Sequence, residues 1–132
     1  MNDWTDKWLL VAEDDPYSFA FLRELLATKG ANIVHAENGL KAFAEVMKHP
    51  EISVVLMDIK MPVVNGLEST RLIKKYKPNI KVIAQTAFAM SEDFQRCIDA
   101  GCDDYITKPV MPELLIATLE KYLFYPNVIV KV

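Results

Sequence analysis

Side chains that could do chemistry stand directly after short, largely apolar runs in this 132-residue chain. They are Glu13, Asp14, Asp58, Thr86 and Lys108. If folding brings them together, three carboxylates share one cleft and repel each other unless a positive charge lies among them. Mg²⁺ suits such a site because it is a hard cation that needs few protein oxygens and keeps several waters. A carboxylate beside a cation and a lysine can act as the nucleophile in phosphoryl transfer, while a hydroxyl binds one phosphoryl oxygen.

Five short runs alternate with amphipathic segments and predict where these side chains lie. The runs cover 8–12, 33–36, 52–57, 81–85 and 103–107. Their length and β-branched content are typical of strands buried in a parallel sheet. Leucines at helical spacing, such as Leu22, Leu25 and Leu26, mark an intervening segment as a helix. Strands that alternate with crossover helices predict an α/β fold, with a parallel sheet and helices on both faces.

The carboxyl ends of the strands form one edge of such a sheet, and functional groups gather beyond that edge. The first and third strands should be neighbours, so Glu13, Asp14 and Asp58 should converge. Taken singly, each residue has an ordinary explanation, because an Asp after a strand is often a turn residue and a lysine is often solvated. Only their joint placement favours a site.

Glycines and prolines mark the predicted helix ends. Gly30 and Gly101 should each follow a helix in left-handed backbone geometry. Pro112 should open the last helix, and Pro50 and Pro78 should follow the ends of two others.

Composition and charge exclude several classes of protein. The net charge is −3, which argues against direct nucleic-acid binding, and the lysines Lys74, Lys75 and Lys77 are predicted to form a solvated face. No apolar stretch reaches the roughly 20 residues that span a bilayer, so no membrane contact is expected. Cys97 and Cys102 are too few for a disulfide framework and are expected to pack as small apolar residues. A cytoplasmic location is the expectation.

Four motifs resemble the receiver domains of response regulators. They are LLVAEDDP at 9–16, VVLMDIKMPVVNG at 54–66, AQTA at 84–87 and GCDDYITKPV at 101–110. The resemblance covers roughly 8–123 and implies a flavodoxin-like, five-stranded parallel sheet of order 2-1-3-4-5 with five helices on both faces. The remainder is a leader, 1–7, and a C-terminal tail or linker, 124–132, whose β-branched residues suit either an extended segment or a disordered remnant.

The resemblance also implies a role for each site residue. Asp58 is then the phospho-acceptor, and Mg²⁺ (or Mn²⁺) is held by Asp14, Asp58 and the backbone carbonyl of Lys60, with Glu13 acting largely through water. Thr86 and Lys108 bind the phosphoryl oxygens, and Thr86 and Tyr105 form the switch. The Lys108–Pro109 bond is expected to be cis.

Three positions depart from the family pattern. The acidic pair is Glu-Asp at Glu13 and Asp14, where Asp-Asp is usual. Asn65 replaces a frequent Asp, which should be harmless, and Ser18 replaces a frequent Asn near the metal loop.

The function that the resemblance implies is a phospho-accepting domain of a two-component phosphorelay. It is not an enzyme in the ordinary sense, since it catalyses only its own phosphorylation and dephosphorylation. Its expected partners are a sensor histidine kinase and a histidine-phosphotransfer domain, and a weak homodimer is a further candidate. The segments QTAFAM and GCDDYITKPV look most like receivers attached to hybrid sensor kinases, so the domain could be the cytoplasmic part of a membrane-anchored kinase. The few residues that follow the last predicted helix also favour phosphate transfer to a partner over control of a DNA-binding domain.

Three alternative functions fit the sequence less well. A haloacid-dehalogenase-like phosphatase has a second acid two residues after its nucleophile, where this chain has Lys60. A flavodoxin-like flavin carrier needs a Ser/Thr/Gly-rich loop after the first strand, where this chain is acidic. A scaffold pseudo-receiver is disfavoured because every residue that phosphorylation needs is present.

Overall fold

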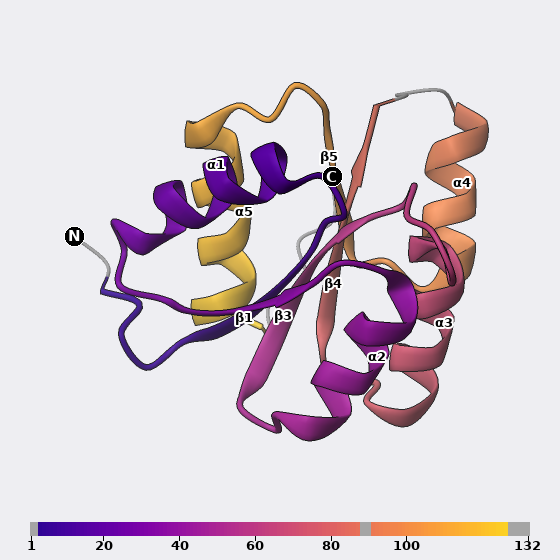
Figure 1. Cartoon of the computed structure of the whole chain (residues 1–132), viewed down its shortest axis with the longest axis horizontal. Coiled ribbons are helices and arrows are strands. Elements are labelled where there is room, and N and C mark those ends of the chain that lie inside the picture. The colour runs from indigo at the N-terminus through magenta and orange to yellow at the C-terminus, as the bar shows by residue number, and fades with distance from the viewer. Residues whose placement is uncertain (1–2, 88–90, 127–132) are drawn as a thin grey trace.

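Strands and helices alternate along the whole described chain, which covers residues 3–87 and 91–126 of the computed structural model, the side chains of 91–93 excepted (Figure 1). The strands are β1 (Trp8–Ala12), β2 (Asn32–Ala36), β3 (Ile52–Asp58), β4 (Lys81–Thr86) and β5 (Asp104–Thr107). The helices are α1 (Pro16–Ala27), α2 (Gly39–Lys48), α3 (Gly66–Tyr76), α4 (Ser91–Ala100) and α5 (Pro112–Phe124). The sheet is parallel throughout, in the order β2-β1-β3-β4-β5, which confirms the predicted fold.

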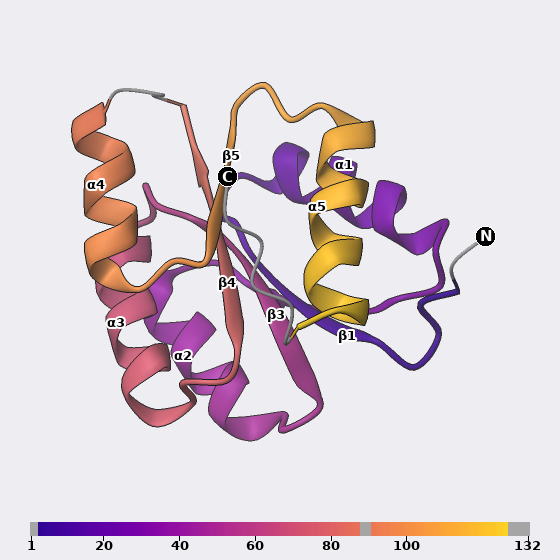
Figure 2. The same cartoon turned by 180° about the vertical axis from the view of Figure 1, so that it is seen from behind.

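Two apolar cores lie on the two faces of the sheet. Helices α1 and α5 cover one face, and α2, α3 and α4 cover the other (Figures 1 and 2). Alternation along β1 supplies both cores, because Leu9 and Val11 face α1 and α5 while Leu10 and Ala12 face the opposite side. Each fully buried leucine contributes about 1.5–3 kcal/mol to folding. Because these strands are parallel, the carboxyl ends of β1, β3, β4 and β5 lie at one edge of the sheet.

Side-chain caps and close backbone contacts shape the loops at this edge. Asp15, Asn38 and Asn65 accept hydrogen bonds from backbone amides at the starts of α1, α2 and α3. Asn65 can thus cap α3 as the frequent Asp would; whether the replacement is harmless stays a prediction. A Cβ at Gly66 would lie only 2.3 Å from the carbonyl oxygen of Asp58, and one at Gly39 only 1.9 Å from that of Val64. These two glycines let the loop after Asp58 pack tightly against its neighbours.

The predicted helix ends agree with the structure. Gly30 has φ +84° and Gly101 has φ +103°, the left-handed geometry expected after a helix. Pro112 opens α5. Cys97 is buried and Cys102 is half-buried, which agrees with the prediction that they pack as small apolar residues. Burial raises the pKa of Cys102 to about 12, so this thiol stays protonated at neutral pH.

The prediction of a solvated lysine face is wrong for Lys74. Its Nζ lies 2.6 Å from Asp103 Oδ2 and 2.7 Å from the carbonyl oxygen of Ile80, and 18% of its side chain is exposed. Asp103 Oδ2 also accepts a hydrogen bond from the amide of Val82 at 2.8 Å. This ion pair joins the end of α3 to the start of β4 and the loop before β5.

Trp4 is fully buried, which the sequence did not predict for a polar leader. Its ring packs in the core between the sheet, α1 and α5, and its amide donates to the carbonyl oxygen of Lys29 at 2.9 Å. The segment that precedes β1 is thus held against the end of α1.

Candidate functional site

Glu13, Asp14 and Asp58 converge where β1 and β3 end side by side. One carboxylate oxygen from each residue lies within 4.8 Å of the others. Glu13 and Asp58 are buried and Asp14 is exposed, so the cluster is reached from its Asp14 side. The structure therefore brings together the three acids that the strand ends indicated.

Asp58 has a hydrogen-bond donor on each carboxylate oxygen. Oδ1 accepts from the backbone amide of Lys60 at 3.0 Å, and Oδ2 accepts from Lys108 Nζ at 3.2 Å. In the sheet Asp58 pairs with Gln85, and the carbonyl oxygen of Gln85 accepts from the amide of Ile59 at 3.2 Å. Backbone on both sides of Asp58 is thus held by β4 and by the loop that follows.

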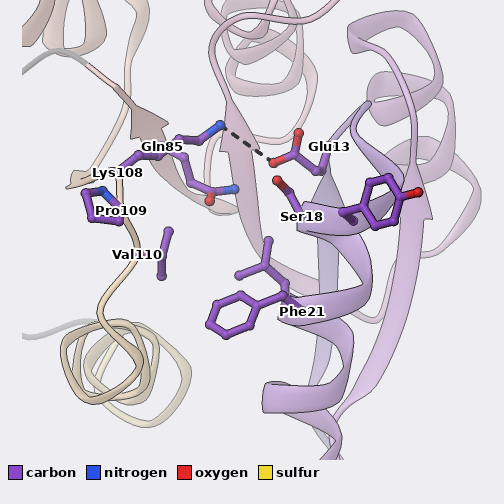
Figure 3. Close-up of a pocket in the computed structure, with 9 residues that line it drawn as sticks. Glu13, Ser18, Phe21, Gln85, Lys108, Pro109 and Val110 are labelled. Carbon is purple, nitrogen blue, oxygen red and sulfur yellow. Dashed lines mark ion pairs between the residues drawn. The ribbon is translucent and has the colours of Figure 1, made fainter.

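Lys108 reaches the acids from the end of β5. Its amide donates to the carbonyl oxygen of Thr86 at 2.8 Å, and its peptide bond with Pro109 is cis, as expected. Its Nζ lies 3.8 Å from Glu13 Oε1 (Figure 3) and 3.2 Å from Asp58 Oδ2. The ammonium therefore forms ion pairs with both buried carboxylates.

Of the two buried acids of the cluster, Glu13 has fewer hydrogen-bond donors. Its Oε2 accepts from the amide of Asp15 at 3.3 Å, whereas Oε1 has no hydrogen-bond partner among the residues described. Its backbone oxygen accepts from His35 Nε2 at 2.9 Å, which holds the start of the β1–α1 loop. Burial, and then the neighbouring carboxylate of Asp58, raise the pKa of Glu13 to about 7; Lys108 opposes this shift only weakly.

The donor set fits a hard divalent cation. The cluster offers carboxylate oxygens only, and one of them, the buried Glu13 Oε1, lacks a hydrogen-bond donor within the described chain. A cation there would offset the repulsion that raises the pKa of Glu13. The hydrogen bond from its amide holds Lys60 next to Asp58, and the backbone carbonyl of Lys60 is the further ligand that the family resemblance implies.

The two residues expected to form the switch lie on neighbouring strands, Thr86 at the end of β4 and Tyr105 near the start of β5. Thr86 ends β4 and is buried, whereas Tyr105 in β5 has 38% of its surface exposed. The ring of Tyr105 meets that of Phe94 edge to face, with centroids 4.6 Å apart. The structure thus has Tyr105 on the surface, against α4.

A cavity of about 410 Å³ lies beside the acids, between α1 and the segment that follows β5 (Figure 3). Its polar lining includes Glu13, Ser18, Gln85 and Lys108, and Phe21 and Val110 form part of its apolar wall. Ser18, which departs from the family pattern, donates to Asp15 Oδ2 at 2.8 Å. Gln85 was not singled out from the sequence, although an amide within an otherwise apolar strand was a signal that could have indicated it.

Among the residues that the structure describes, no helix is both long and apolar enough to cross a bilayer.

Comparisons with known proteins agree with this geometry. The family model of the response regulator receiver domain matches residues 9–120. The chain is 39% identical over 115 residues to hybrid signal transduction histidine kinase I of Dictyostelium discoideum, with 81% of this chain but 7% of that protein covered. It is 37% identical over 120 residues to the polar-differentiation response regulator DivK of Brucella anthropi, with 89% of this chain and 96% of that protein covered.

Solved structures resemble the chain over nearly its whole length. The receiver domain of sensor histidine kinase PA1611 from Pseudomonas aeruginosa, which has a magnesium ion in its active-site cleft, is 27% identical, with a TM-score of 0.83 and 89% and 97% of the two chains covered. The receiver domain of Ssk1 from Saccharomyces cerevisiae, crystallised with the histidine phosphotransfer protein Ypd1, has a TM-score of 0.88 and covers 96% and 94%; at 22% identity it supports the fold alone. With its family-model match, its sheet order and its acidic cleft, this chain belongs to the response regulator receiver domains of two-component signalling.

Proposed function

We propose that Asp58 accepts a phosphoryl group from a phosphohistidine of a sensor kinase, with Mg²⁺ (or Mn²⁺) bound by Asp14, Asp58, the Lys60 carbonyl and, through water, Glu13. The observation that carries this proposal is the position of the Asp58 carboxylate, within hydrogen-bonding distance of Lys108 and within 4.8 Å of two further acids. A nucleophile that is itself an anion needs positive charge on both sides to meet an anionic phosphoryl group.

The chemistry is an in-line displacement on phosphorus. An Asp58 oxygen forms the new P–O bond as the P–N bond to the donor imidazole breaks, and the imidazole leaves with the bonding electrons. When bound, the cation neutralises charge on the phosphoryl oxygens. Lys108, already 3.2 Å from Asp58, binds one of those oxygens, and the hydroxyl of Thr86 binds another. No general base is required, because a carboxylate is ionised at neutral pH.

Thr86 and Tyr105 carry the conformational response in this proposal. As Thr86 moves toward the phosphoryl group, the ring of Tyr105 leaves Phe94 and turns inward, which changes the face formed by α4, β5 and α5. Chemical shift changes with a beryllofluoride mimic should cluster within 86–115. Changes limited to the neighbours of Asp58 would argue against a switch.

The partners follow from the acyl phosphate itself. It is a high-energy donor, so a histidine-phosphotransfer domain can take the group by the reverse of the loading step. Ssk1, which shares this fold, was crystallised with such a protein. We place the domain in the cytoplasm and without direct nucleic-acid contact, since its net charge of −3 does not favour phosphate backbones. The C-terminal tail, 124–132, is proposed to be a linker or an extended segment; 127–132 lie outside the residues that the structure describes. A weak homodimer is a further proposed assembly.

A phosphatase of the haloacid-dehalogenase type is a poorer fit. Such an enzyme needs a second acid two residues after the nucleophile. Lys60 occupies that position, and its backbone amide donates a hydrogen bond to Asp58.

The test is uptake of phosphate from a small acyl phosphate, followed by intact mass spectrometry. With Mg²⁺, the wild-type chain should gain one phosphoryl group, and EDTA should prevent the gain. Asp58→Asn should gain none, whereas Asp99→Asn, at an exposed acid on α4, should behave as wild type. Uptake by Asp58→Asn at the wild-type rate would refute the assignment. Label transfer to histidine-phosphotransfer domains of the same organism then tests the partner.

A further inference from the structure

Gln85 has a buried amide with an unused donor. The residue is 1% exposed, and its Nε2 has no hydrogen-bond partner within the described chain. It lies on β4 on the same face as Ile83, whose side chain belongs to the apolar core under α1 and α5. An apolar residue would fill this position without leaving a buried polar group unpaired. The amide is therefore unexplained by packing alone.

The same cavity contains an unused acceptor. Gln85 and Glu13 both line the space of about 410 Å³ between α1 and the segment after β5, and Glu13 Oε1 has no hydrogen-bond partner there (Figure 3). Neither Ser18 nor Lys108 gives that oxygen a hydrogen bond, since Ser18 donates to Asp15 and Lys108 donates to Asp58 and reaches Glu13 Oε1 only as an ion pair at 3.8 Å. A donor and an acceptor that line one cavity large enough for water can be joined by one ordered water or by a small side-chain rotation.

Within the described chain, the carboxylate of Glu13 accepts one hydrogen bond, and that bond is long. The amide of Asp15 holds Oε2 at 3.3 Å, while Oε1 is 3.8 Å from Lys108 Nζ, beyond hydrogen-bond length. A glutamate side chain is longer than the usual aspartate at this position and has one more torsion to fix. Groups that orient the acids around a metal affect its affinity nearly as much as the ligands do.

We propose that Gln85 is a positioning residue of the cation site: its amide donates, directly or through one water, to Glu13 Oε1 and fixes the orientation of that carboxylate toward the cation. This inference rests on the proposed function, because it concerns the cation that the acids would hold. Gln85 does not contact the cation or the phosphoryl group; its whole effect passes through Glu13.

The test is a double-mutant cycle in Mg²⁺ affinity, measured by NMR titration of the full chain. Gln85→Met removes the amide and keeps the length of the side chain. It should raise the Mg²⁺ Kd about tenfold, the low end for groups that orient metal ligands. In a Glu13→Ala background the same substitution should change the Kd less than about twofold, because its target is gone. In wild type, the side-chain NH₂ resonance of Gln85 should move with Mg²⁺ and saturate at the same Kd.

Two controls separate positioning from packing. Ile83→Met, on the same face of β4, should keep the wild-type Kd. In EDTA, Gln85→Met should unfold at the wild-type urea midpoint or above it, since it removes an unpaired buried group. An unchanged Kd in Gln85→Met, or an equal loss with and without Glu13, would refute the role of Gln85. A wild-type chain that binds no Mg²⁺ would instead refute the cation of the proposed function, and this inference with it.

Discussion

Glu13 and Asp58 are both buried acids at strand ends, yet their carboxylates differ in the number of hydrogen bonds that they accept. Asp58 has a donor on each oxygen, one from the Lys60 amide and one from Lys108. Glu13 has a single donor, and burial with the nearby Asp58 raises its pKa to about 7. The metal-free site therefore favours a proton where the loaded site would favour a cation.

The pH dependence of stability in EDTA should report this competition. Because the folded pKa of Glu13 lies above its unfolded value of 4.5, the folded state binds the proton more tightly, and stability falls as pH rises from about 4.5 through about 7. Glu13→Gln removes that loss. In urea titrations at pH 8 it should be more stable than wild type by about 1 kcal/mol, a figure reduced for solvent screening. At pH 5 the two should be nearly equal. A difference that stays constant with pH would contradict the account.

At this scale the sequence predicted which residues form the site, but not which of their atoms have hydrogen-bond partners. Asp58, Thr86 and Lys108 follow apolar runs, and a parallel sheet must bring such positions together. The unused oxygen of Glu13 and the unused amide of Gln85 depend on side-chain torsions and on the cavity under α1, which no spacing in the sequence encodes.

At the scale of elements, the strands were predictable nearly to the residue because β1, β3 and β4 are largely buried, mostly apolar runs. β1 has the predicted bounds, and β3 extends one residue further, to Asp58. Lys74 was misjudged because helical periodicity marks the outer face of α3 without showing what covers it. Its partner, Asp103, lies 29 residues further along the chain.

The Lys74–Asp103 ion pair should contribute to stability. Lys74→Met leaves Asp103 partly buried, with the more distant ammonium of Lys81 4.0 Å away. The free energy of unfolding should therefore fall by about 2–3 kcal/mol, less than for a fully buried pair. Lys75→Met, at the exposed neighbour, should stay within about 0.5 kcal/mol of wild type. Urea midpoints measure both. Equal effects of the two substitutions would show that the pair adds nothing.

At the scale of the whole molecule, the strand order follows from the family resemblance, and the alternation of elements alone left it open. The residue at which the folded domain begins was harder to predict from the sequence. Trp4 lies in a polar stretch, and its burial depends on a gap between α1, α5 and the sheet that exists only once all three are assembled.

Truncation of Trp4 should therefore destabilise the domain as a core substitution does. Trp4→Ala should lower the free energy of unfolding by about 3–5 kcal/mol. Trp4→Phe should cost less, because it keeps most of the ring and removes an indole N–H that has no partner within the described residues. Thermal unfolding of both variants measures the difference. If Trp4→Ala unfolds like wild type, the segment before β1 is not part of the core.

The central claim is that Asp58 takes the phosphoryl group with the help of a cation. The most direct measurement is chemical trapping: after treatment with an acyl phosphate, borohydride reduces an aspartyl phosphate to an alcohol, and peptide mass spectrometry locates the residue. The account predicts reduction at position 58 alone, in the sample with Mg²⁺ and not in the one with EDTA. Reduction at Asp14, or at position 58 with equal yield in EDTA, would contradict it.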